Sequence, residues 1–215
     1  MRIGGPFGFA VRSGPVHPDV GASSMRILIA GLLGGLAMFL WGAVSHMLLP
    51  IGEAGHKTAT QQQVVLDALA QSTSGEGVYM YPGIAPERMS DPAAMQAFSQ
   101  DSRGKPYAFV VYQPGGNPVN QSMTPNLMKQ WATDTLAALV VAWVLALGAW
   151  SFGRRVLVAA ALGLFSALTV SLPQWNWYLF PLDFTLGSLA GQVIGWTVAG
   201  AAIAWWLGRS AKTVD

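Results

Sequence analysis

Four long apolar segments divide the chain, and one long polar segment and two short breaks separate them. The first apolar segment reads RILIAGLLGGLAMFLWGAVSHMLLP, which begins with a cation and ends at a proline. A helix of about 20 apolar residues crosses the core of a bilayer. The pattern therefore predicts an all-α membrane bundle of four transmembrane helices, at 26–50, 125–153, 156–172 and 184–207.

The polar segment, 51–124, is expected to form a small extracytoplasmic α/β insertion between the first two helices. Apolar residues recur at helical spacing in TQQQVVLDALAQ, whereas EGVYMY and KPYAFVVYQ alternate as strands do. Asp91 and Pro92 supply an N-cap and a first-turn proline for a short helix that ends near Phe98. Two strands alone are marginally stable, so we expect this unit to rest on the transmembrane helices or on a partner.

The remaining segments are expected to be tails and a loop. Residues 1–25 contain several glycines and prolines without periodicity, which predicts a disordered cytoplasmic tail, and 208–215 would form a second one. Between the third and fourth helices, PQWNWYLFPLDF predicts an outer aromatic loop at 173–183, with Asp183 placed to cap the last helix.

Basic residues indicate the orientation. They occur before the first helix, in the turn at Arg154 and Arg155, and after the last helix, whereas the aromatic loop has none. Loops rich in lysine and arginine stay in the cytoplasm, and long segments cross largely regardless of charge. We therefore expect a multi-pass protein of a bacterial inner membrane, with both termini cytoplasmic and 51–124 periplasmic.

Composition supports a membrane protein and excludes several classes of function. Of the 215 residues, 52% are hydrophobic and 10% are charged, against about 25% charged in soluble domains. A net charge of +2 without a basic patch argues against nucleic acid as a partner. The chain has no cysteine, which excludes disulfides, thiolate chemistry and iron–sulfur clusters.

Small residues recur on one face of the first and last predicted helices. Such faces let two helices approach closely, which stabilises helix pairs in membranes. We expect the two faces to pack against each other, with a channel-lining face as the alternative. The glycines concerned are Gly31, Gly35 and Gly42 in the first helix and Gly187, Gly191 and Gly195 in the last.

His46 is the only histidine inside a predicted span. It follows Gly42 by four residues, so it should face the bundle interior, where ionisable groups often mark function. We expect a ligand-binding site at the outer ends of the first and last helices, covered by the aromatic loop. Its candidate residues are His46, Gln192, Ser45, Glu53, Trp175, Trp177 and Asp183. The alternative is an interface histidine bonded to a backbone carbonyl or to Glu53.

The sequence gives less support to a haem site, a zinc site or nucleophilic catalysis. A haem between helices usually takes two facing histidines, but only one predicted span carries one. His46, Glu53 and His56 are suitable zinc ligands, yet their spacing matches no known motif. No nucleophile or phosphate-loop motif occurs, and Asp134, three residues after Trp131, is expected to be interfacial and solvated. We predict no cofactor, no metal site and no catalytic residue.

Two stretches, WGAVSHMLLPIGEAG and WNWYLFPLDF, together resemble an uncharacterised family of small four-span bacterial inner-membrane proteins. The resemblance covers 25–207. It implies a bacterial origin and the four-span layout, and it assigns neither an activity nor a site residue.

Three functions remain open at this point. The first is a non-catalytic accessory or structural subunit that packs in or beside a larger membrane complex or a homo-oligomer. Low charge, the glycine faces and a small insertion favour it. The second is an outer-leaflet binding protein for a lipid, a quinone or a similar amphiphile, which the aromatic residues near His46 favour. The third is a membrane enzyme or transporter of unknown substrate.

Overall fold

The computed structural model describes residues 20–209, which are mainly helical and include one small two-stranded sheet. Three helical segments are long and apolar enough to cross a membrane: Ser24–Leu48, Phe152–Tyr178 and Leu182–Arg209. The chain is therefore a membrane protein. The bundle consists of α1 (Val20–Ala43), which continues into the π-helix η1 (Val44–Leu48), α4 (Thr124–Ala146), α5 (Phe152–Tyr178) and α6 (Leu182–Arg209).

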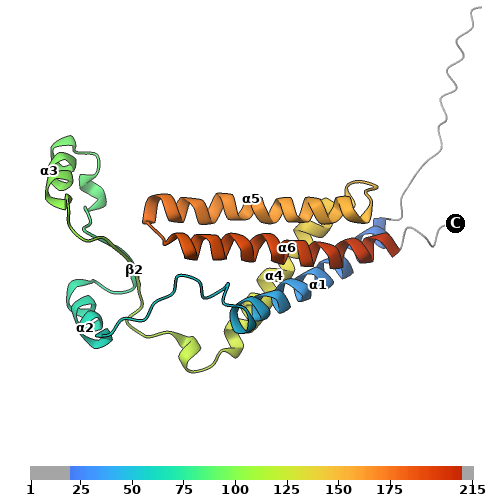
Figure 1. Cartoon of the computed structure of the whole chain (residues 1–215), viewed down its shortest axis with the longest axis horizontal. Helices are drawn as coiled ribbons and strands as arrows, with labels where there is room; N and C mark the ends of the chain where they lie inside the picture. The colour runs from blue at the N-terminus through green and yellow to red at the C-terminus, as the bar shows by residue number, and fades with distance from the viewer. Residues whose placement is uncertain (1–19, 210–215) are drawn as a thin grey trace, which may run out of the picture.

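The four long helices lie in the order α4–α1–α6–α5, so that α1 and α6 occupy the middle of the bundle (Figure 1). Small side chains fill the helix contacts, because close approach is what stabilises helices in lipid. The fully buried alanines come from all four helices: Ala30, Ala138, Ala142, Ala159, Ala167 and Ala199. Leu145 and Ile203 are the largest fully buried side chains among the described residues.

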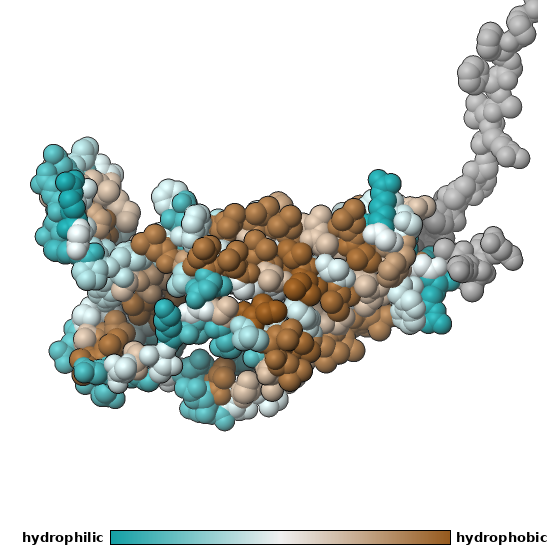
Figure 2. Space-filling view, in the orientation of Figure 1, coloured by the Kyte–Doolittle hydropathy of each residue, from teal (hydrophilic) through white to brown (hydrophobic). Residues whose placement is uncertain are grey.

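Apolar residues also cover the outside of the bundle. On α1, Leu28, Leu32, Leu36 and Leu40 follow one another at intervals of four, and each is 42–54% exposed. Hydrophobic residues gather along the bundle in Figure 2, and hydrophilic ones gather on the insertion and at the opposite end. A soluble protein would not leave such a large apolar surface in water, so this surface is suited to lipid.

The insertion contains the four predicted elements, together with two short 3₁₀ turns. They are α2 (Gln62–Ser72), β1 (Gly77–Tyr81), α3 (Pro92–Ser102) and β2 (Ala108–Tyr112). The strands pair antiparallel, with Tyr79 opposite Val110. The side chain of Asp91 accepts a hydrogen bond from the backbone N–H of Ala93, which is the predicted N-cap of α3. The strands lie beyond one end of the bundle (Figure 1).

The insertion touches the bundle through a row of aromatic rings. Phe109 of β2 lies 4.7 Å from the Tyr178 ring and 6.1 Å from the Phe180 ring, measured between centroids. Phe180 in turn lies 5.0 Å from Phe184 at the start of α6. The sheet therefore packs on the turn between α5 and α6. Such a contact is expected, because two strands alone are marginally stable.

The predicted aromatic loop at 173–183 is wrong. α5 continues through Pro173 to Tyr178, and only three residues separate it from α6. A proline removes one helical N–H, but in a membrane every other backbone group still gains from helical bonding. The helix ends where Leu179 adopts a left-handed conformation, with φ 56°, and its N–H bonds to the Gln174 carbonyl.

Other helix boundaries also differ from the prediction. The second helix ends at Ala146 rather than at 153, because Gly148 follows and Ser151 begins a new helix by capping α5. α1 begins by Val20, so the end of the predicted 1–25 tail is helical, and α6 extends to Arg209. The rest of both predicted tails, 1–19 and 210–215, lies outside the described residues.

Candidate ligand-binding cavity

A cavity of about 790 Å³ lies at the end of the bundle that carries the insertion, and we call it the insertion-side cavity. Its walls come from the end of α1, from η1, from the 51–56 loop and from the first halves of α4 and α6. Its lining includes both apolar and polar side chains. The apolar lining includes Met38, Phe39, Trp41, Met47, Ile51, Met123, Leu127 and Phe184, and the polar lining is Ser45, His46, Glu53, His56, Gln130, Asp134, Ser188 and Gln192.

A widened helical turn places His46 at this cavity. In η1 the Leu49 N–H reaches back to the Val44 carbonyl at 2.9 Å, a spacing of five residues. Such π turns add a residue to the helix and often occur at functional sites. Gly52 packs beneath the His46 ring, because a Cβ there would lie 2.5 Å from it. His46 is thus exposed at the mouth of the cavity rather than buried between helices.

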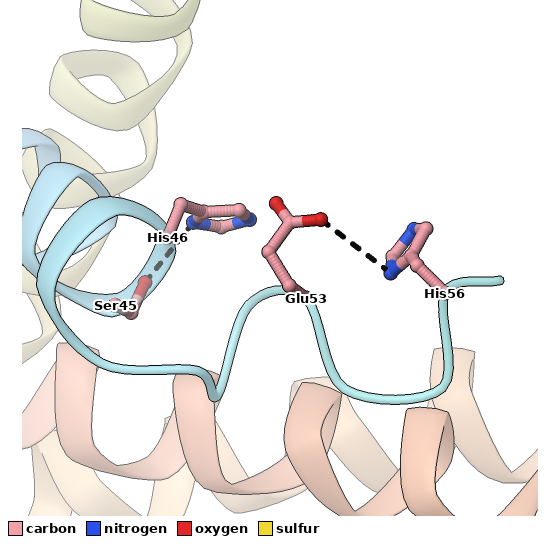
Figure 3. Close-up of polar contacts among 4 residues, drawn as sticks. All are labelled: Ser45, His46, Glu53 and His56. Carbon is pink, nitrogen blue, oxygen red and sulfur yellow. Dashed lines mark hydrogen bonds and ion pairs between the residues drawn. The ribbon is translucent and has the colours of Figure 1, made fainter. Parts of the chain in front are cut away.

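His46 Nδ1 lies near two oxygens, the Ser45 hydroxyl at 3.1 Å and the Gly42 carbonyl, and the second contact favours one tautomer. Its Nδ1 lies 2.9 Å from the Gly42 carbonyl oxygen, which can only accept, so Nδ1 donates. The Ser45 hydroxyl donates to the same carbonyl at 3.0 Å. The expected alternative of a histidine bonded to a backbone carbonyl is therefore present. It coexists with a site, because the other nitrogen, Nε2, remains free and points toward Glu53 (Figure 3).

Glu53 and His56 complete a polar group at the mouth. The Glu53 carboxylate lies between the two imidazoles in Figure 3, with its Oε2 3.9 Å from His56 Nδ1. The 51–56 loop reaches this position by folding onto α6. A Cβ on Gly187 would lie 2.7 Å from the Ile51 carbonyl oxygen, and Gly55, with φ 79°, packs equally closely on Phe184.

The α6 wall of the cavity is open at Gly191. A Cβ built on Gly191 would meet nothing within 4 Å, and the same holds for Gly42 on α1. The Trp41 indole N–H donates to the Gly191 carbonyl at 2.9 Å, which ties the two helices together across the cavity wall. Gln192 lines the same wall, and its side-chain oxygen accepts a bond from Trp196 at 3.2 Å.

The predicted packing of the two glycine faces is therefore correct only in part. Gly195 packs against Met38 and Trp41 of α1, but Gly31 and Gly35 face Leu139 and Thr135 of α4. Gly187 packs against the 51–56 loop rather than against a helix. The interpretation of Gly42 and Gly191 as packing residues is wrong, because both positions border the cavity.

Three predicted site residues lie elsewhere. Trp175 and Trp177 are in the last turns of α5, with 46% and 74% of their surfaces exposed, and they do not line the cavity. They do not cover it, because α5, the helix that carries them, contributes no residue to the lining. Asp183 lies in the first turn of α6, where its Oδ1 accepts from the Phe184 N–H at 2.9 Å, and it is not part of the lining either.

The structure adds two polar residues from α4. Gln130 donates to the Asp134 carboxylate at 2.9 Å, and both line the cavity. Asp134 is half-buried. The sequence contained a signal for this wall, since two polar residues four apart share one face of the predicted second helix.

Comparison of the chain with family models, with curated proteins and with solved structures finds no match. The arrangement itself indicates the kind of molecule that fits. Apolar and polar residues line one cavity, whose size lies in the range of about 300–1,000 Å³ that is usual for small-molecule sites.

Proposed function

We propose that the chain crosses a bacterial inner membrane four times, with α4 as the fourth span. The Arg26 guanidinium at the start of α1 donates to the Leu207 carbonyl near the end of α6, at 3.0 Å. Both ends of the helical region thus meet at one end of the bundle. This favours an even number of crossings, and α1, α5 and α6 account for three.

The outer surface of α4 supports this proposal. Leu136, Val140 and Trp143 lie on one face, and each is more than half exposed. The helix has 23 residues, or about 34 Å of length, which is enough for a bilayer core. Its first half carries Lys129, Gln130 and Asp134, and this half forms one wall of the insertion-side cavity.

We propose that the insertion-side cavity binds an amphiphile, such as a lipid or a quinone, at the outer leaflet. The observation that carries this proposal is the combination of a cavity of about 790 Å³ with apolar walls and the polar group His46, Glu53 and His56. In the tautomer with a proton on Nδ1, His46 Nε2 accepts hydrogen bonds, as the Glu53 carboxylate does, so both would accept from a hydroxyl or ammonium group on the head of the ligand. The tail would lie against Met38, Trp41 and other apolar residues.

The test is native mass spectrometry of the full chain, extracted gently from the membrane in which it is expressed. The wild-type protein should retain a small mass of the amphiphile class. His46→Ala should lose most of it, because a head group loses a hydrogen bond worth about 1 kcal/mol or more, while the protein remains monodisperse. Trp175→Ala is the matched control, since this ring lies outside the cavity. Equal retention in both variants would contradict the site.

A second candidate, an accessory subunit of a larger membrane complex, rests on the insertion. Within 57–123, Ala94 is the only buried residue. Val78 and Val111, opposite each other in the sheet, are 61% and 73% exposed. They share a sheet face with Phe109, which contacts the bundle, so this face is covered at Phe109 and exposed beside it. An exposed apolar patch of this kind is typical of a surface that binds a partner. The same spectra test this candidate, which requires a second protein or a second copy in stoichiometric amount.

A further inference from the structure

A second cleft, of about 260 Å³, lies at the end of the bundle opposite the insertion-side cavity. All four long helices or their connections contribute to it. Arg26 comes from α1, Ala146 from α4, Arg155 from α5 and Leu207 from α6. We call it the arginine cleft. Nothing in the proposed binding of an amphiphile uses it.

The charges of the arginine cleft are not balanced within the described chain. Between residues 20 and 209, no carboxylate lies within 4 Å of either guanidinium. Arg26 donates one Nη2 hydrogen bond to the Leu207 carbonyl, yet its Nε is buried without a partner. The Nε of Arg155 is also buried without a partner. Buried donors without acceptors are costly, and the same two arginines line the cleft, where an anion would meet guanidinium groups that no carboxylate of the described chain neutralises.

The position of Arg155 adds to the imbalance. It lies near the start of α5, whose first turn contains no acid. The N-terminus of a helix carries a partial positive charge, which disfavours a cation there and favours an anion. Two guanidinium groups therefore line one small cleft, close to the positively polarised start of a helix.

We propose that the arginine cleft binds the phosphate group of an anionic phospholipid in the leaflet opposite the insertion. Guanidinium groups match phosphate oxygens with paired hydrogen bonds. The remaining lining is small or apolar, namely Ile27, Ala149 and Leu207 among others, which suits the glycerol and upper acyl region of a lipid. Free phosphate shares the head-group chemistry but would gain nothing from these apolar contacts.

The experiment titrates the full chain, in a neutral detergent, with dioleoyl-phosphatidylglycerol and follows bound lipid by native mass spectrometry. Dioleoylglycerol, which has the same chains without the phosphate, should not bind with measurable affinity. Arg155→Gln should weaken phosphatidylglycerol binding by roughly tenfold or more, as loss of a charged hydrogen bond predicts. Arg154→Gln is the matched control, because Arg154 is adjacent but exposed and outside the cleft. It should weaken binding by no more than about fivefold.

Further arms keep the proposal falsifiable. Should Arg155→Gln fail to fold, Arg26→Lys replaces it as the test variant. Lysine retains the charge but lacks the planar guanidinium that pairs with two phosphate oxygens, so binding should weaken measurably. Equal losses of phosphatidylglycerol affinity in Arg154→Gln and Arg155→Gln would show that the lipid is attracted by surface charge in general, and would contradict binding in the cleft. Binding of inorganic phosphate that depends on Arg155, without binding of the lipid, would overturn the lipid as the source.

Discussion

Gly191 and Gly195 lie four residues apart on one face of α6, yet their surroundings are opposite. A Cβ on Gly195 would lie 2.6 Å from the Trp41 ring and 2.7 Å from the Met38 sulfur. A Cβ on Gly191 would find open space. One glycine therefore permits the contact between α1 and α6, and the other keeps the insertion-side cavity open.

This difference predicts opposite results for the same substitution. Gly195→Leu should lower the stability of the bundle by at least about 2 kcal/mol, because Met38 and Trp41 would have to move. Gly191→Leu should leave the protein folded, or slightly more stable, since leucine is a better helix former than glycine. It should nevertheless lose the bound amphiphile, because the side chain enters the cavity.

Thermal unfolding in detergent measures the first effect, and native mass spectrometry measures the second. Gly195→Leu controls for the volume of the added side chain. A Gly191→Leu protein that aggregates as Gly195→Leu does would show that Gly191 packs after all. A folded Gly191→Leu protein that retains all of its ligand would show that the ligand does not bind against α6.

Residue spacing predicts a face but not what the face meets. The sequence indicated that these glycines share one side of a helix, and it placed His46 and Gln192 near the same end. It could not show that a π turn displaces His46 to the cavity mouth, because this turn depends on how the 51–56 loop folds onto α6. The wall formed by Gln130 and Asp134 depends likewise on which helix becomes the neighbour of α1.

At the scale of elements, the connection between α5 and α6 shows where local signals conflict. Pro173 and the aromatic residues after it favour a loop, but α5 continues for five residues beyond the proline. The turn is then made by Leu179 in a left-handed conformation, which a branched side chain disfavours. The tight turn brings Phe180 against Phe109, so it also positions the insertion.

This conformation predicts that Leu179→Gly stabilises the protein by about 1 kcal/mol, because glycine adopts positive φ without strain. Leu172→Gly, inside α5, is the control and should destabilise by about the same amount. Thermal unfolding in detergent compares the two variants with the wild-type chain. A loss of stability in Leu179→Gly comparable to that in Leu172→Gly would mean that no such turn exists.

Elements with strong local signals were predicted well. The insertion helices and strands follow from apolar periodicity and from the Asp91 cap, all of which act within a few residues. The ends of α4 and α5 were predicted poorly. An apolar composition continues across these ends, so the packing of the bundle determines where each helix ends. Hydropathy therefore located the long helices better than it located their ends.

At the scale of the whole molecule, the number of crossings determines on which side the C-terminus lies. Should α4 remain outside the bilayer, α1, α5 and α6 would give three crossings and would place the two termini on opposite sides. The contact between Arg26 and Leu207 favours the same side. Arg26 and Leu207 also line the arginine cleft, and Arg154 and Arg209 follow in the same parts of the chain. The positive-inside rule assigns an end of the bundle with so many arginines to the cytoplasm.

Reporter fusions to the full chain decide between these layouts. Alkaline phosphatase, which is active only in the periplasm, should be active when inserted near Gly116 and inactive when fused after Asp215. A cytoplasmic fluorescent reporter after Asp215 should be bright, which confirms that the silent fusion is expressed. Phosphatase activity at both positions would mean three crossings and would remove α4 from the membrane. In that case Gln130 and Asp134 would face bulk water, and the cavity they border would open to the periplasm instead of to the outer leaflet.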